Sequence, residues 1–102
     1  MLKKQPPIED VIYLESDSNY TIYHLQNGCV FISSKTLKQS QQELQFSLFL
    51  RIHKSYLLNP NFINKISIER NKLIVILKNG TQLSVSRRKA LELKEDLRKF
   101  LE

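Results

Sequence analysis

Polar side chains near the middle of the chain have the chemistry to bind an anion together. The group consists of Arg51, His53, Lys54 and Ser55. They belong to an alternating run, 49–59, that Pro60 ends, and alternate residues of a strand point to opposite faces. Guanidinium and ammonium groups bind phosphate oxygens and also reach guanine O6 and N7. The run therefore predicts a strand that is anchored by its apolar residues and carries a basic tip.

Positive charge is concentrated in the same part of the chain. The 102 residues have a net charge of +6. Residues 35–89 contain eleven Lys and Arg against two acidic residues, a balance of +9, whereas residues 1–34 carry −2 and residues 90–102 carry −1. This distribution favours a polyanionic partner, with nucleic acid ahead of an anionic membrane surface. A basic surface that serves only solubility is the alternative.

A second basic cluster follows Ser86, which is a suitable N-cap for a last helix. Arg87, Arg88 and Lys89 would stand at the positive end of the helix dipole, where cations are unfavourable. A phosphate would compensate them, because N–H groups and guanidinium groups would converge on it. Alternatively, these side chains bend back to solvent or pair with Glu92.

A third polar tip is predicted at residues 17–20. Asp17, Ser18 and Asn19 are turn formers, and Tyr20 begins the next alternating run. An Asn amide can read adenine N6 and N7, whereas a Ser hydroxyl only positions a protein on phosphate. Each of these tips therefore holds at least one side chain that can read a base.

Short strands and two helices are expected to position the tips. Alternation predicts strands at 11–15, 20–25, 29–33, 63–68, 72–78 and 82–85, with hairpin turns at Asn27-Gly28, residues 69–71 and Asn79-Gly80. A short central helix is expected between residues 34 and 46, capped by Ser34 or Thr36. A C-terminal helix would use one apolar face, made of Ala90, Leu93, Leu97, Phe100 and Leu101. The predicted fold class is mainly β, with antiparallel sheets.

Length and composition favour a single domain at residues 8–102, preceded by a flexible tail or linker remnant at residues 1–7. Cys29 is the only cysteine, so an intrachain disulfide is impossible and a reducing, cytoplasmic setting is favoured. We expect Cys29 to be a small buried hydrophobe on a strand. The longest aliphatic run, residues 73–77, is too short for a membrane span, so no membrane partner is expected.

The sequence offers little for catalysis. His24 and His53 are the only histidines, and no spacing of Cys, His and carboxylates is typical of a metal site. Both glycines, Gly28 and Gly80, are used in hairpins, which leaves none for a phosphate-cradling loop. We therefore expect no enzymatic activity, metal, cofactor or small-molecule substrate. His24 is expected to be a surface or a satisfied core residue, whereas His53 would face an anion either protonated or as a neutral donor.

The run from Arg51 to Asn59 resembles the arginine-x-histidine-x-serine-aromatic-leucine-x-asparagine signature of the LytTR (LytR/AlgR-type) DNA-binding domain family. The resemblance extends over residues 8–101 and includes Ile12–Glu15 with Asn19-Tyr20, Thr36-Leu37, Asn79-Gly80 and Val85–Arg88. It implies an elongated fold of antiparallel β-sheets with short helices. It also implies binding to duplex DNA through loops set into successive major grooves, usually at paired direct repeats in promoters.

The resemblance also implies roles for individual residues. Base contacts fall on Asn19 or its neighbour Tyr20, on Lys54 and on Arg88. Phosphate contacts fall on Arg51, His53, Ser55, Ser86 and Lys89, and Arg87 can do either. The implied function is that of a bacterial transcription regulator, either the effector domain of a two-component response regulator or a stand-alone protein, with a homodimer on DNA as one arrangement.

Two other binding functions fit the same basic composition. A β-rich module for single strands or RNA would need aromatic side chains on an open sheet face to stack bases. Tyr20, Tyr23 and Tyr56 are candidates, although tyrosines on strands are more often at the edge of a core. A protein-interaction module would instead present its basic face to an acidic protein partner.

Overall fold

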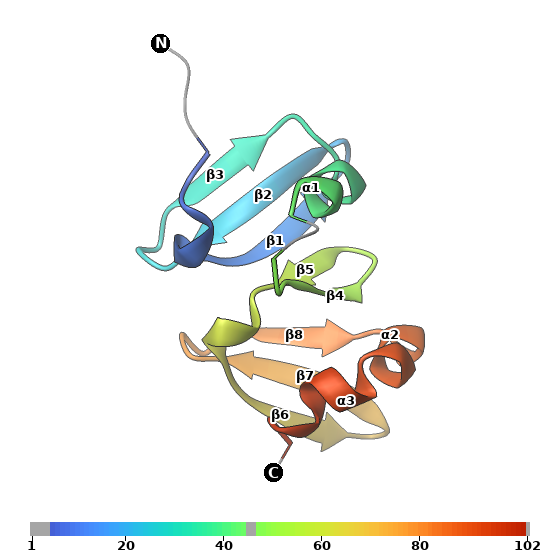
Figure 1. Ribbon diagram of the computed structural model, residues 1–102. Coiled ribbons are helices and arrows are strands. Elements are labelled where there is room, and N and C mark those ends of the chain that lie inside the picture. The colour runs from blue at the N-terminus through green and yellow to red at the C-terminus, as the bar shows by residue number, and fades with distance from the viewer. Residues whose placement is uncertain (1–4, 45–46, 102) are drawn as a thin grey trace.

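The computed structural model describes residues 5–44 and 47–101 (Figure 1). Sheet A has five strands in the order β3-β2-β1-β5-β4, and sheet B has three in the order β6-β7-β8. The strands are β1 (Val11–Asp17), β2 (Tyr20–Leu25), β3 (Val30–Ser33), β4 (Leu50–His53), β5 (Tyr56–Leu58), β6 (Ile63–Glu69), β7 (Lys72–Leu77) and β8 (Gln82–Val85). The helices are α1 (Leu37–Glu43), α2 (Arg87–Glu92) and α3 (Lys94–Arg98), with 3-10 turns η1 (Ile8–Asp10) and η2 (Pro60–Phe62).

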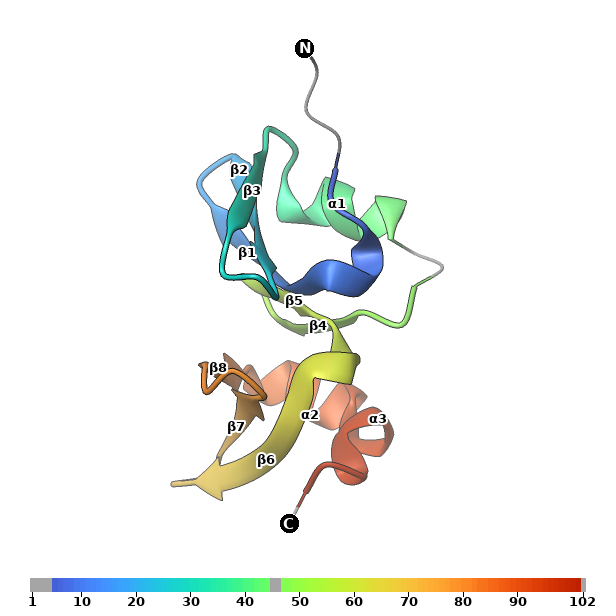
Figure 2. The same ribbon diagram turned by 90° about the vertical axis from the view of Figure 1, so that its left-hand side faces the viewer.

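The molecule is elongated, with extents of 47 × 25 × 24 Å, and the two sheets follow one another along its length (Figures 1 and 2). Every strand pair is antiparallel. The expected class, mainly β with a short central helix and antiparallel sheets, is therefore confirmed.

Apolar residues form one core on each side of sheet A. One core joins sheet A to sheet B and α3, and its fully buried members include Ile52, Leu58, Ile66, Val75 and Leu97. The other lies between sheet A and α1 and includes Leu14, Tyr23, Leu37 and Leu57. Because β1 and β5 each contribute residues to both cores, these strands hold both ends of the molecule together.

Two hairpin loops have the same geometry. In the first, the N–H of Gly28 donates to Leu25 O and the N–H of Cys29 to Asn27 Oδ1, and the loop that contains Gly80 repeats these bonds at Leu77 O and Asn79 Oδ1. Both glycines have positive φ, 88° and 92°. These loops are longer than the expected two-residue turns. Cys29 consequently precedes β3 and is exposed, so the prediction of a buried cysteine on a strand was wrong.

The run 49–59 forms a hairpin and not one strand. β4 and β5 pair through the register His53↔Tyr56, with Lys54 and Ser55 as the turn between them. The apolar stem was expected correctly, since Ile52, Leu57 and Leu58 are at most 1% exposed. Alternation continues across the turn without Gly or Asn, and it therefore did not signal the change of direction.

Helical segments cover both sheets. Thr36 caps α1, because its Oγ1 accepts from Gln39 N and the Gln39 side chain accepts from Thr36 N. The C-terminal helix is broken: α2 ends at Glu92, Leu93 has φ −102° and ψ 15°, and α3 begins at Lys94. The expected apolar face is confirmed for Leu97, which is buried, and for Ala90, Leu93 and Phe100, which pack against the same core. Leu101 instead remains 40% exposed beside Ile66, and the expected single helix is two.

Two further expectations concern the N-terminal tail and membrane-spanning segments. Residues 1–4 of the expected tail lie outside the described residues, and the Gln5 side chain donates to the Tyr23 hydroxyl at 3.4 Å. In the described part of the chain, no helix has the length and apolar character needed to cross a bilayer.

Candidate nucleic-acid interface

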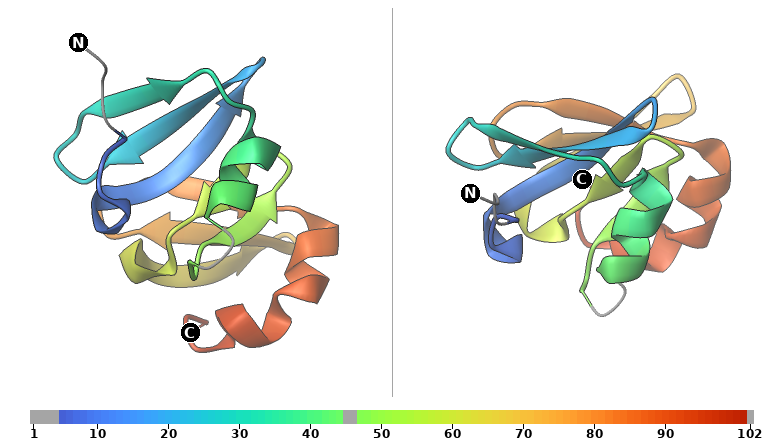
Figure 3. Two further views of the ribbon diagram at one scale, coloured as in Figure 1. Left: turned by 45° about the horizontal axis from the view of Figure 1, so that its top comes forward. Right: turned by 90° about the horizontal axis from the view of Figure 1, so that it is seen from above.

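The predicted tips lie on one long edge of the molecule. Ser16 N–H donates to Ser55 O at 3.0 Å, which places the β1–β2 turn beside the β4–β5 turn. Ser86 N–H donates to Ile52 O at 2.9 Å, which places the start of α2 beside β4. Figure 1 shows them on the right-hand side, and the view from above in Figure 3 shows the same grouping. We call this surface, made of residues 18–20, 53–55 and 86–89, the loop edge.

Two of the tips share one hollow. A shallow depression of about 480 Å³ separates the β4–β5 turn from α2, and it is lined by Gln41, Arg51, His53, Lys54, Ser86, Arg88 and Lys89. Most of the predicted DNA contacts of these tips therefore lie within one surface. Asn19 and Tyr20 do not line this hollow, so the β1–β2 turn forms a separate part of the loop edge.

Arg51 holds the β4–β5 turn in place. Its Nε donates to His53 O at 2.8 Å, its Nη2 to Lys54 O at 2.6 Å and its Nη1 to Gln41 Oε1 at 2.7 Å. The side chain is half-buried, and burial lowers the pKa of its guanidinium. Three of the five N–H donors of a guanidinium are thus used within the protein. The arrangement fits a residue that positions the tip more than one that is free to grip phosphate.

His53 has a defined hydrogen-bonding state. The backbone N–H of Ser55 donates to His53 Nδ1 at 3.1 Å, so this nitrogen acts as an acceptor. A neutral ring that accepts at Nδ1 carries its proton on Nε2. Of the two states considered from the sequence, the neutral donor is therefore the one that fits. The backbone of Ser55 thus bonds to two residues: its N–H donates to His53, and its O accepts from the N–H of Ser16.

The cations of α2 differ in how they are paired. Ser86 Oγ accepts from Lys89 N at 3.2 Å, as expected for an N-cap. Lys89 Nζ lies 3.1 Å from Glu92 Oε2, so the alternative of a pairing with Glu92 holds for this residue. Arg87 and Arg88 are exposed, and neither is within 4.0 Å of a carboxylate among the described residues. They are the side chains of this tip that are free to meet a partner.

The β1–β2 turn presents its polar groups outward. Ser18 adopts the left-handed φ of 54° and connects Asp17 to Tyr20, which pair in the ladder. Asn19 is exposed, and Tyr20 is 53% exposed. The turn was expected from its Asp and Asn residues, and the positive φ falls on the serine between them.

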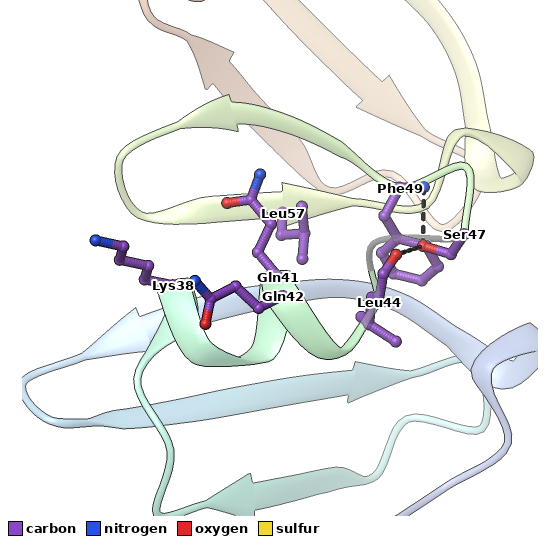
Figure 4. Close-up of a pocket in the computed structure, with 7 residues that line it drawn as sticks. All are labelled: Lys38, Gln41, Gln42, Leu44, Ser47, Phe49 and Leu57. Carbon is purple, nitrogen blue, oxygen red and sulfur yellow. Dashed lines mark hydrogen bonds between the residues drawn. The ribbon is translucent and has the colours of Figure 1, made fainter.

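Gln41 was missed by the sequence reasoning. It comes from α1, accepts from Arg51 and lines the hollow of the loop edge. It also lines a second hollow of about 430 Å³ between α1 and β5 (Figure 4). The other residues there are Lys38, Gln42, Leu44, Ser47, Phe49 and Leu57. An amide on a helix carries no signal of such a contact, because the contact depends on how α1 packs on sheet A.

Most aromatic rings are engaged inside the protein. Tyr13 stacks on His24 at 4.2 Å and meets Tyr56 edge-on at 6.0 Å. Tyr23 is 4% exposed and packs on Phe31. His24 Nε2 is 2.9 Å from Glu15 Oε1, as expected for a satisfied histidine. The exposed large residues on β3 are Val30 and Ile32, which are aliphatic, so the module for single strands or RNA is not favoured.

No metal centre is visible in the described residues, where no group of three or more His, Cys, Asp and Glu side chains comes together. The hollows of the loop edge and of α1 are lined mainly by cations, amides and apolar groups. The cations gather in the hollow of the loop edge, and that hollow therefore suits the binding of an anion.

Comparisons with known proteins show the family and the fold of the chain. The family of LytTr DNA-binding domains matches residues 4–98. The chain is 36% identical over 87 residues to the sensory transduction protein LytT of Enterococcus faecalis, covering 84% of the chain and 36% of that protein. It is 32% identical over 93 residues to LytT of Bacillus anthracis, covering 89% of the chain and 37% of that protein.

An uncharacterized response regulatory protein of Yersinia pestis is also 32% identical over 93 residues, covering 88% of the chain and 37% of that protein. The chain therefore spans little more than a third of the length of these relatives. A solved LytTr DNA-binding domain of a putative methyl-accepting/DNA response regulator from Bacillus cereus has the same fold, with a TM-score of 0.74 at 24% identity over 88% of this chain and 83% of that one. The chain belongs to the LytTR DNA-binding domain family.

Proposed function

We propose that this domain binds specific sequences of duplex DNA as part of a bacterial transcription regulator. The observation that carries the proposal is the loop edge, where three separated segments that contain cationic and amide residues lie along one side of an elongated body. The whole body extends 47 Å along its principal axis, which is more than one helical repeat of B-DNA, about 34 Å, and this supports contacts in two successive major grooves.

The proposed role of each residue follows from its exposure and from the hydrogen-bond donors that the protein itself does not use. Asn19 or Tyr20, Lys54 and Arg88 contact bases, since their side chains are exposed and can reach into a groove. Phosphate contacts come from His53, Ser55, Ser86, Arg87 and Lys89. Arg51 acts mainly by setting the β4–β5 turn, with two N–H donors left for phosphate. The domain has a binding role and no catalytic one.

The wider setting is inferred from the relatives. Two of them are named sensory transduction proteins and another a response regulatory protein. We infer that the domain is the effector of such a regulator and acts in the cytoplasm. It occupies paired direct repeats in promoters, with two copies of the chain on one site.

A selection of bound sequences from a random duplex pool tests the proposal. We expect a recurring motif in pairs, and tighter binding to the selected duplex than to either of its single strands. The affinity should fall steeply with salt, with a log–log slope of roughly −5 for about six phosphate contacts. Equal affinity for duplex and single strands, or no enriched motif, would contradict the proposal. An acidic protein as true partner would leave no DNA affinity at moderate salt.

A further inference from the structure

A fourth turn lies on the same side of the molecule as the loop edge. The β6–β7 turn consists of Arg70 and Asn71, and Glu69 pairs with Lys72 across its base. The register Leu73↔Val85 puts the beginning of β7 beside the end of β8, from which Ser86 continues. Figure 1 shows this turn below α2 on the right-hand side, and the view from above in Figure 3 shows it on the same side as the other turns.

The turn and the loop edge form one continuous surface. A hollow of about 620 Å³ lies between the turn and α2, and Asn71, Lys72, His53, Ser86 and Arg87 are among its lining residues. His53 and Ser86 also line the hollow that holds Lys54 and Arg88. His53 and Ser86 therefore form the common border of the two hollows, which places Lys72 next to the predicted phosphate contacts.

The charges of this turn are free for a partner. Arg70 and Lys72 are exposed, and neither has a carboxylate within 4.0 Å in the described part of the chain. Arg70 and Asn71 both adopt left-handed φ, 51° and 67°. Asn is common in this conformation, but a long side chain such as Arg is not. The first position of the turn thus carries a guanidinium where Asn or Gly would fit the backbone better.

From this arrangement we propose that the β6–β7 turn is a further DNA contact, in which Arg70 and Lys72 bind backbone phosphates at the end of the site opposite to the β1–β2 turn. The proposal rests on the proposed function and extends the contact surface beyond the start of α2. The turn lies at the far end of the row of turns, so its contacts fall on the outer part of the binding site (Figure 1). Contacts to phosphate position the protein and carry no direct sequence information.

The test uses the selected duplex and a random duplex of the same length. The double variant Arg70→Asn/Lys72→Gln removes both cations, and Asn at position 70 tolerates the left-handed backbone. We expect its affinity to fall on the order of tenfold for both duplexes, and the salt slope to become shallower by about 2. Hydroxyl-radical footprinting should show lost protection at the same end of each bound repeat and nowhere else.

Two single variants complete the test: one is a matched control, and the other changes the charge of the turn in the opposite direction. Lys78→Gln removes an exposed lysine from sheet B at the opposite edge, and it should leave affinity, slope and footprint unchanged. Glu69→Gln removes the carboxylate of the same turn, and it should tighten binding to both duplexes. If the double variant binds and protects DNA like wild type, the inference is overturned while the proposed function stands. If wild-type protein selects no duplex, the proposed function fails first.

Discussion

The loop edge, extended by the β6–β7 turn, and the opposite edge of the molecule are built from the same kind of hairpins but use their polar groups differently. At the opposite edge, Asn27 and Asn79 side chains accept from backbone N–H groups of their own loops, and Gln26 Nε2 donates to Asp10 Oδ1. These three side chains bond within the protein, whereas Lys78 of the same edge is exposed and has no carboxylate within 4.0 Å in the described part of the chain. On the loop-edge side, Lys54, Arg70, Lys72, Arg87 and Arg88 have no carboxylate within 4.0 Å among the described residues.

The comparison shows that the residues needed to form a turn differ from the residues that a turn presents to a partner. Asn-Gly loops suffice to reverse a strand, and the edge that has them carries the acidic η1 as well. In two turns of the other edge, the first position holds a long cationic side chain, Lys54 or Arg70, which forms turns less readily than Asn or Gly. Side chains that weaken a local preference without an internal partner indicate a partner outside the chain.

The largest effect is expected where the loop edge is attached to the core. Ile52 is fully buried, and its carbonyl accepts from Ser86 N. Ile52→Ala should lower the free energy of unfolding by about 2–5 kcal/mol, because it leaves a cavity between the sheets. Chemical denaturation measures this loss. Ile32→Ala is the control, since Ile32 is 62% exposed on β3, and an equal loss there would contradict the reason given.

The next largest effect is expected at Arg88, whose loss should reduce the preference of the protein for its selected DNA sequence. Arg88→Ala should cost about 1–3 kcal/mol of binding free energy on the selected duplex and much less on a random one, since a base contact is lost. Titrations with both duplexes measure the difference. Arg98→Ala is the matched control, because Arg98 is exposed on α3 and paired with Glu95 at 3.3 Å. Equal losses on both duplexes would assign Arg88 to phosphate.

Local signals account for the parts of the molecule that were predicted from the sequence. The Asn-Gly loops, the cap at Thr36 and the cap at Ser86 each depend on residues within a few positions of one another. The same locality explains the errors. Nothing near Lys54-Ser55 marks a reversal, and nothing near Leu93 marks the break between α2 and α3.

The composition of the binding surface could be predicted only where residues lie next to one another in sequence. The contact between Arg51 and Gln41 depends on how α1 packs against sheet A, and the place of Lys72 beside Arg87 depends on the register of sheet B. Residues 69–71 were predicted as a turn, but their side of the sheet follows from strand order. Long-range pairing, which no local pattern encodes, therefore decides which turns share an edge.

Arg51 allows a test of whether the loop edge depends on internal bracing. Arg51→Lys keeps the charge but loses the fork that reaches His53 O, Lys54 O and Gln41 at once. We expect weaker binding to the selected and the random duplex alike, by about 1 kcal/mol, because the whole β4–β5 turn shifts. Gln41→Ala should weaken binding in the same way, and a double-mutant cycle should show coupling of at least about 0.5 kcal/mol. Additive effects would indicate that Arg51 contacts DNA independently.

The smallest effect is expected from a cation that the protein neutralises itself. Lys35 follows β3 beside the start of β2, near Tyr20, and its Nζ pairs with Glu43 of α1. The Lys35 hydrogen bond lowers the pKa of the Glu43 carboxyl, so any stability from the pair is present at neutral pH and is lost as the pH falls through that lowered pKa. Both groups are largely exposed, and the loss should be small.

Glu43→Gln should therefore change thermal stability slightly at pH 7 and not at all below the folded-state pKa of Glu43, which thermal unfolding as a function of pH would show. The variant also frees Lys35 on the loop-edge side of sheet A. We expect the salt slope of DNA binding to steepen by up to about 1, because one more cation can replace a counterion on the duplex. An unchanged slope would show that Lys35 lies beyond the reach of the DNA. The DNA-binding surface of sheet A would then not extend past the β1–β2 turn.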